Sequence, residues 1–126
     1  MRGVALPSSW HHNLRQPDEA REYPRGKTEV VRRGGILVAR STFQPGWRWS
    51  DDVGPLKGEP SCRRSHTGYL VSGRLRVLLD AGEELELSAG DVYVIDSGHD
   101  SWTVGDDPCV SIEFSFMSKE ENHESY

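Results

Sequence analysis

The chain has 126 residues, of which 35% are hydrophobic, with 13 glycines, 7 prolines and a net charge of −5. This length suits one domain with its own core, the many turn residues are typical of an all-β fold, and the negative charge argues against a nucleic-acid partner, since phosphate contacts need clustered cations. Two cysteines make no disulfide scaffold, and no run nears the ~20 apolar residues that span a bilayer, so we expect no membrane partner and a cytoplasmic protein with reduced thiols.

Residues 1–27 are predicted to form a polar arm without clear periodicity. Pro17 and Pro24 confine any helix to a single turn over 18–22, because proline is not accommodated inside a helix. We expect the arm to lie across the rest of the domain or to pair with a neighbouring chain.

Strands are predicted from Thr28 onward, with two β-prone runs separated by the glycine pair at 34–35. Trp47 and Trp49 then fall on one face of a further strand. The segment 50–61 is expected to be a loop, because it has two prolines and two glycines but no alternation. Loops of this length often border a site.

The stretch 61–102 carries the longest apolar alternation in the chain. Its runs 74–79 and 84–87 place apolar side chains at every second position, which is the pattern of a strand. The polar segment 80–83 between them contains a glycine, as a tight hairpin requires. The last strand is predicted to place one set of apolar side chains on one face: Val110, Ile112, Phe114 and Phe116. About nine short strands with frequent turns indicate a sandwich or a barrel.

Cys62, His66 and His99 are the candidate metal ligands, with Asp100 and Glu113 as further donors. Imidazole and thiolate favour zinc, iron or copper over calcium. Cys62 and His66 would lie roughly 13 Å apart on a straight strand, so they share an ion only if the chain bends between them. The alternative is a hydrogen-bonded interior His66 and a loop His99, and both interpretations stay open. A Cys62 nucleophile would need a third orienting residue, which spacing does not identify.

The segment 90–99, GDVYVIDSGH, resembles the second conserved motif of the cupins, small β-barrel proteins of jelly-roll type, in its two glycines and their spacing. Asp96 stands where proline is usual. Anchoring the first cupin motif on Gly73 places His66 at the usual glutamate position and Cys62 at a usual histidine position. The segments PGWRW and GYLVSG are similar to those of a subgroup of small bacterial cupins.

The resemblance implies an all-β, cupin-type jelly-roll barrel over 28–117, preceded by the short irregular arm at 1–27 and followed by an acidic tail at 118–126. It also implies a homodimer through the arm or edge strands, and exposed sheet edges give a physical reason for pairing. If a metal is bound, we expect a divalent transition metal (Zn, Fe, Mn or Ni) held by His66, His99 and Cys62.

A small-molecule site is expected in the barrel lumen around His66 and His99. The candidate ligand contacts are Trp47, Arg48, Trp49, Tyr69, Tyr93 and Trp102. Tyr69 and His66 fall on opposite faces of a regular strand, so at least one of these aromatic residues belongs to the wall or the outside. Arg48 suits bidentate binding of an anion, and its alternative is a salt bridge to Asp51 or Asp52.

Two classes of function remain open on the sequence. One is a small-molecule-binding domain, with or without a metal. The other is a metal-dependent cupin enzyme, an isomerase, lyase or oxygenase, acting on a small aromatic or carboxylate-bearing substrate. The number of metal donors separates the two classes. An open catalytic metal typically has three protein ligands, and the sequence offers two central histidines and one cysteine.

Overall fold

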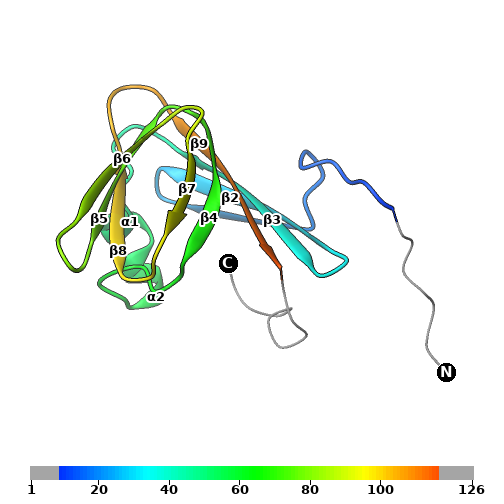
Figure 1. Cartoon of the computed structure of the whole chain (residues 1–126), viewed down its shortest axis with the longest axis horizontal. Coiled ribbons are helices and arrows are strands. Elements are labelled where there is room, and N and C mark those ends of the chain that lie inside the picture. The colour runs from blue at the N-terminus through cyan, green and yellow to red at the C-terminus, as the bar shows by residue number, and fades with distance from the viewer. Residues whose placement is uncertain (1–8, 117–126) are drawn as a thin grey trace.

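The computed structural model describes residues 9–116, which form two antiparallel sheets and two short helices (Figure 1). The acidic tail predicted for 118–126 lies outside the described residues. The strands are β1 (Glu19–Tyr23), β2 (Gly26–Arg33), β3 (Ile36–Phe43), β4 (His66–Ser72), β5 (Arg74–Leu79), β6 (Glu84–Ser88), β7 (Val92–Ile95), β8 (His99–Thr103) and β9 (Cys109–Phe116). One sheet has the order β1-β2-β3-β9-β4-β7 and the other β6-β5-β8.

The two sheets pack on each other through one apolar core. The alternation predicted in 74–79 and 84–87 is confirmed, since β5 and β6 pair and their apolar side chains face this core. Residues from both sheets and from the segment that leads into the first helix meet there: Trp47, Trp49, Leu70, Leu75, Val77, Leu87, Tyr93 and Ile95. This all-β arrangement is the predicted one. Neither helix within the described residues has the length and apolar character needed to cross a membrane.

The helical turn predicted for 18–22 is wrong, because residues 19–22 belong to strand β1. β1 and β2 form a hairpin in which Tyr23 lies opposite Gly26, so Pro24 and Arg25 make a two-residue turn. Arg25 follows a proline and adopts a φ of 58°, as the residue after proline does in a type II turn. Strand structure therefore begins inside the range predicted to be an irregular arm.

The strand predicted around Trp49 and the loop predicted for 50–61 are also corrected. Trp49 opens helix α1 (Trp49–Asp52), and α2 (Gly54–Lys57) follows. Asp52 stabilises α1 because its carboxylate accepts a hydrogen bond from the backbone N–H of Arg48 at 3.0 Å. α2 has proline at its start and ends at Gly58, whose φ is 68°.

The apolar face of β9 points outward, away from the core. Phe114 and Phe116 are exposed, while Ser111 is buried on the opposite face. The register explains this outcome, because β9 lies between β3 and β4 and places Glu113 opposite Ala39 and Gly68 on the inner side. A polar strip of β9 therefore faces the interior between the sheets.

Candidate metal and ligand site

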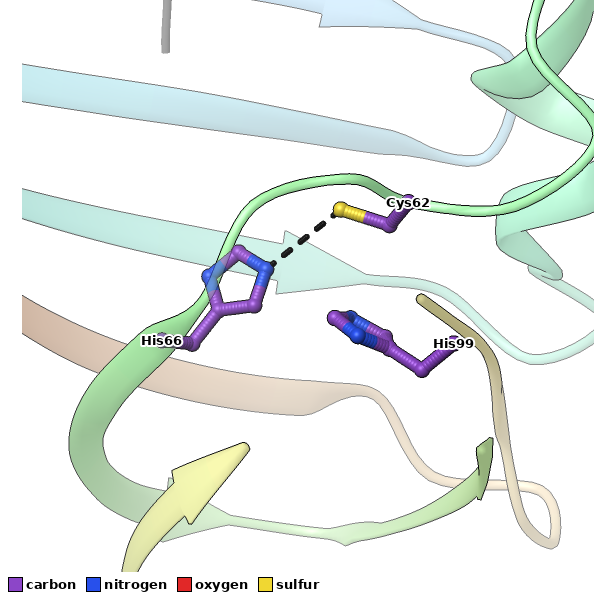
Figure 2. Close-up of side chains that lie close together, drawn as sticks. All are labelled: Cys62, His66 and His99. Atoms are coloured by element: carbon purple, nitrogen blue, oxygen red, sulfur yellow. Dashed lines mark hydrogen bonds between the residues drawn. The ribbon is translucent and has the colours of Figure 1, made fainter. Parts of the chain in front are cut away.

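Cys62, His66 and His99 converge between the two sheets (Figure 2). Cys62 forms an isolated bridge with His99, and its backbone N–H donates to the His99 carbonyl at 2.8 Å. The chain then bends over 63–65, which have no regular structure, before His66 begins β4. The two residues were expected to share an ion only if the chain bends between them, and it does. The bend brings Cys62 Sγ to 3.5 Å from His66 Nε2.

The spacing of the three donors fits a transition metal. All three donor atoms lie within 4.8 Å of one another. With a zinc–sulfur distance of about 2.3 Å and a zinc–nitrogen distance of about 2.05 Å, tetrahedral geometry separates the two donors by about 3.6 Å. The observed Sγ–Nε2 distance of 3.5 Å agrees with this value. Cys62 and His99 are buried, and the ring planes of the two histidines lie at 73° with centroids 5.1 Å apart.

Both histidines are oriented by a partner on Nδ1. His66 Nδ1 lies 2.7 Å from Glu113 Oε1, and His99 Nδ1 lies 2.8 Å from the carbonyl oxygen of Asp96. Carbonyl and carboxylate oxygens accept hydrogen bonds, so each Nδ1 carries the proton and each Nε2 is the coordinating nitrogen. Such partners fix the orientation of metal-binding imidazoles. The Tyr93 hydroxyl in turn donates to Glu113 Oε2 at 2.8 Å.

Gly68 leaves room for Glu113 and Tyr93 behind His66. It lies opposite Glu113 in the β4–β9 pair and opposite Tyr93 in the β4–β7 pair. A Cβ atom at Gly68 would lie 2.8 Å from Glu113 Cγ and 2.9 Å from the Tyr93 hydroxyl, and it would also clash with the backbone carbonyl of Ile112. Only glycine leaves room for the three groups where they stand.

The charges of Cys62 and His66 stabilise each other when no metal is bound. Burial alone raises the pKa of the Cys62 thiol, but hydrogen bonds from His66 and His99 outweigh burial and lower that pKa to about 6. Burial alone lowers the pKa of His66, but the Glu113 carboxylate and the Cys62 sulfur raise it to about 10. A thiolate therefore faces an imidazolium at neutral pH. Metal binding requires loss of the proton on His66 Nε2.

A cavity of about 110 Å³ adjoins the three donors, and all three line it. Phe43, Trp47 and Trp49 form an aromatic part of its wall, and Phe43 stacks on Trp47 with ring centroids 3.8 Å apart. Another part is polar: Tyr23, Thr28 and Ser41 line it and are joined by hydrogen bonds of 2.7 and 2.9 Å. An aromatic wall with a few polar groups is the usual make-up of a small-molecule pocket.

Comparison with known proteins identifies the fold. No family model and no curated protein sequence matches the chain. Among solved structures, an oxalate decarboxylase variant from Bacillus subtilis is 22% identical with a TM-score of 0.58, over 82% of this chain and 28% of that chain. KdgF from a Halomonas species is 20% identical with a TM-score of 0.54, over 84% of this chain and 89% of that one. A cupin-like protein from Thermotoga maritima is 16% identical with a TM-score of 0.53, over 75% of this chain and 71% of that one.

The chain has the cupin fold. The predicted resemblance is thereby confirmed at the level of the fold, and the match covers 28% of the decarboxylase chain. Its donor set differs from the usual three histidines and one glutamate implied by the cupin motifs. Here one sulfur and two imidazoles converge, and the carboxylate of Glu113 stands behind His66.

The predicted ligand-contact residues fall into two groups. Trp47 and Trp49 line the cavity, and Tyr93 lies behind it against Glu113. Tyr69 instead faces outward, with 43% of its surface exposed. This agrees with the expectation that Tyr69 and His66 point to opposite faces of their strand.

Arg48 and Trp102 lie outside the cavity lining and contact each other. The Arg48 guanidinium sits 4.2 Å from the centre of the Trp102 ring, and its Nε donates to Asp100 at 3.0 Å. The salt bridge predicted between Arg48 and Asp51 or Asp52 is therefore wrong in its partner: Arg48 pairs with Asp100, and Asp52 pairs with Arg25. Asp100 is engaged there and is absent from the donor cluster.

Several functional residues escaped sequence reasoning. Glu113 was considered only as a metal donor, and its contact with His66 joins residues 47 positions apart. Lys57, in the predicted loop 50–61, lines the cavity, and so do Arg63 and Arg64, which follow that loop. The polar alternation of β9, with Glu113 among serines, was the available signal for an inward polar strip.

Proposed function

We propose that this cupin domain binds a divalent transition metal through Cys62, His66 and His99, and a small molecule in the adjoining cavity. The convergence of the three donors within 4.8 Å carries this proposal. Zinc, iron, manganese and nickel are the candidates, and the sulfur and imidazole donors favour zinc or iron over manganese, which prefers oxygen. Cys62 and Cys109 are free thiols, which supports the cytoplasm as the compartment.

A metal-dependent enzyme is the second candidate, as an isomerase, lyase or oxygenase on a small aromatic or carboxylate-bearing substrate. Three protein ligands that all line one cavity favour it, because catalytic metals keep a position free for substrate or water. When bound, the metal would supply Lewis-acid polarisation of a substrate oxygen. Glu113 would hold the His66 ring in place, and the aromatic wall would exclude water.

Metal content of protein purified without a histidine tag tests the proposal. We expect about one transition metal per chain, removed by a chelator and restored by zinc. Restoration should raise the melting temperature, because a ligand that binds only the folded state stabilises it in proportion to ln(1 + [L]/Kd). Protein that contains no metal and gains no stability from zinc, iron, manganese or nickel would contradict the metal site. Turnover by the loaded protein would favour the enzyme over the binding domain.

We also propose that the domain forms a homodimer through the outer face of β4, β7 and β9. Six exposed apolar side chains share this face: Tyr69, Val71, Val92, Val94, Phe114 and Phe116. The register places Tyr69 beside both Val92 and Ile112, so the face is continuous. Soluble monomers rarely expose apolar patches of this kind. None of these six side chains is charged at neutral pH, so a second copy of the same apolar face is the partner that we propose.

The substitution Phe114→Glu is expected to convert the dimer into a monomer. It places a charge within a face that would be desolvated on pairing. Leu56→Glu is the matched control, because Leu56 is an equally apolar side chain, 69% exposed, on α2. Sedimentation velocity should give a dimer mass for wild type and for Leu56→Glu. A monomeric wild type would refute this interface.

A further inference from the structure

Cationic side chains gather where the cavity opens to solvent. Lys57, Arg63 and Arg64 all line the cavity; the first two are exposed and Arg64 is half-buried. Glu59 is the only carboxylate beside them in the lining, because Glu113 lies deeper and is held by His66 and Tyr93. The mouth is therefore positive in a chain whose net charge is −5.

Two of these cations differ from most of the others in the domain. Within residues 9–116, eight arginines form ion pairs with carboxylates: Arg21, Arg25, Arg32, Arg33, Arg40, Arg48, Arg74 and Arg76. Lys57 and Arg63 form no ion pair among the described residues, and neither does Arg15 in the N-terminal segment. The mouth thus offers two cations that no carboxylate of residues 9–116 holds in an ion pair.

The wall of the cavity offers an unused hydrogen-bond donor as well. Trp47 lines the cavity and is 2% exposed, and its Nε1–H has no partner among the described residues. Buried polar groups are almost always hydrogen-bonded, and an indole nitrogen is only a donor. An acceptor atom on a molecule in the cavity, or a water, would satisfy this donor.

Cavity size limits what enters. An apolar cavity of roughly 150 Å³ takes benzene, and this cavity measures about 110 Å³. The cavity is therefore somewhat smaller than one that encloses benzene, and it fits at most one small ring or a short aliphatic chain whose end extends to the mouth. A charged group on such a molecule would lie at the mouth, next to Lys57 and Arg63.

We infer that the cavity takes a small organic acid, with its carboxylate held at the mouth by Arg63 and Lys57 and its apolar body against Phe43, Trp47 and Trp49. This inference rests on the proposed function, since it names the chemical class of the cavity ligand. The Arg63 guanidinium suits a carboxylate because its N–H groups form a planar fork.

Isothermal titration of the zinc-loaded protein with benzoate and with neutral benzamide tests the inference. Hexanoate and hexanamide form a second pair with an aliphatic body. Each acid is expected to bind about tenfold more tightly than its amide, which corresponds to about 1.4 kcal/mol at 25 °C. Lys57→Gln combined with Arg63→Gln should abolish that preference and leave amide binding unchanged. Arg15→Gln combined with Lys27→Gln removes the same charge away from the cavity and should leave the preference intact.

Zinc content, measured on the same samples, separates this inference from the proposed function. The mouth variant is expected to keep its zinc, because none of the three donors is altered. Equal binding of acid and amide by wild type, or an acid preference that survives in the mouth variant, would overturn the inference. An acid preference lost only in His66→Ala would place the carboxylate at the donors and would also overturn it.

Discussion

Protein carrying Cys62→Ser together with His66→Ala is expected to lose zinc binding, with affinity at least about 100-fold below that of wild type. The physical reason is donor loss: the double variant keeps only His99 of the three converging side chains. Even residues that only orient a metal ligand typically change affinity by about 10–100-fold when replaced. Competition with a chromophoric chelator gives the affinity, and elemental analysis gives the content.

Glu113→Gln refines this prediction. The amide keeps the shape of the carboxylate but removes the charge that stabilises the His66 ring. We expect zinc affinity to fall by about 10–100-fold while the metal content at saturation stays unchanged. His11→Ala, in the N-terminal segment and exposed, is the control and should bind zinc as wild type does. Wild-type affinity in the double variant would show that the metal is held elsewhere or not at all.

Gly68→Ala is expected to weaken both the fold and the site. The added methyl group would press on Glu113, on the Tyr93 hydroxyl and on the Ile112 carbonyl, and the last belongs to the backbone and yields least. Overpacking of this kind typically costs about 1–3 kcal/mol. Because the displaced Glu113 no longer orients His66, zinc affinity should fall as well. Urea unfolding of the metal-free protein gives the stability.

Leu70→Ala is the matched control on the same strand. Leu70 is fully buried and faces the core, so its truncation should cost about 2–5 kcal/mol. Its truncation removes none of the polar groups that hold His66, so zinc affinity of the folded protein should stay as in wild type. If both variants lose zinc affinity equally, the effect of Gly68→Ala reflects general loss of stability and not its place beside Glu113.

Local patterns in the sequence were sufficient for much of the fold. The period-two alternation in 74–79 and 84–87 predicted β5 and β6, because neighbouring side chains of a strand point to opposite faces whatever lies around them. The same holds for the two sets of side chains along β9. Glycines at 34–35 marked the turn between β2 and β3, where both adopt a positive φ. The motif at 90–99 carried the resemblance to cupins.

Tertiary structure decided which face of each strand is inside and which side chains meet. Alternation alone does not say which set of β9 points inward, and pairing with β3 and β4 places Glu113 inside and Phe114 outside. The approach of Cys62 to His66 depends on the bend at 63–65, which no periodicity signals. Contact between Glu113 and His66 joins residues 47 positions apart. Such contacts follow from strand pairing across the whole domain, so residue types and spacing predict the candidate donors but not the oriented site they form.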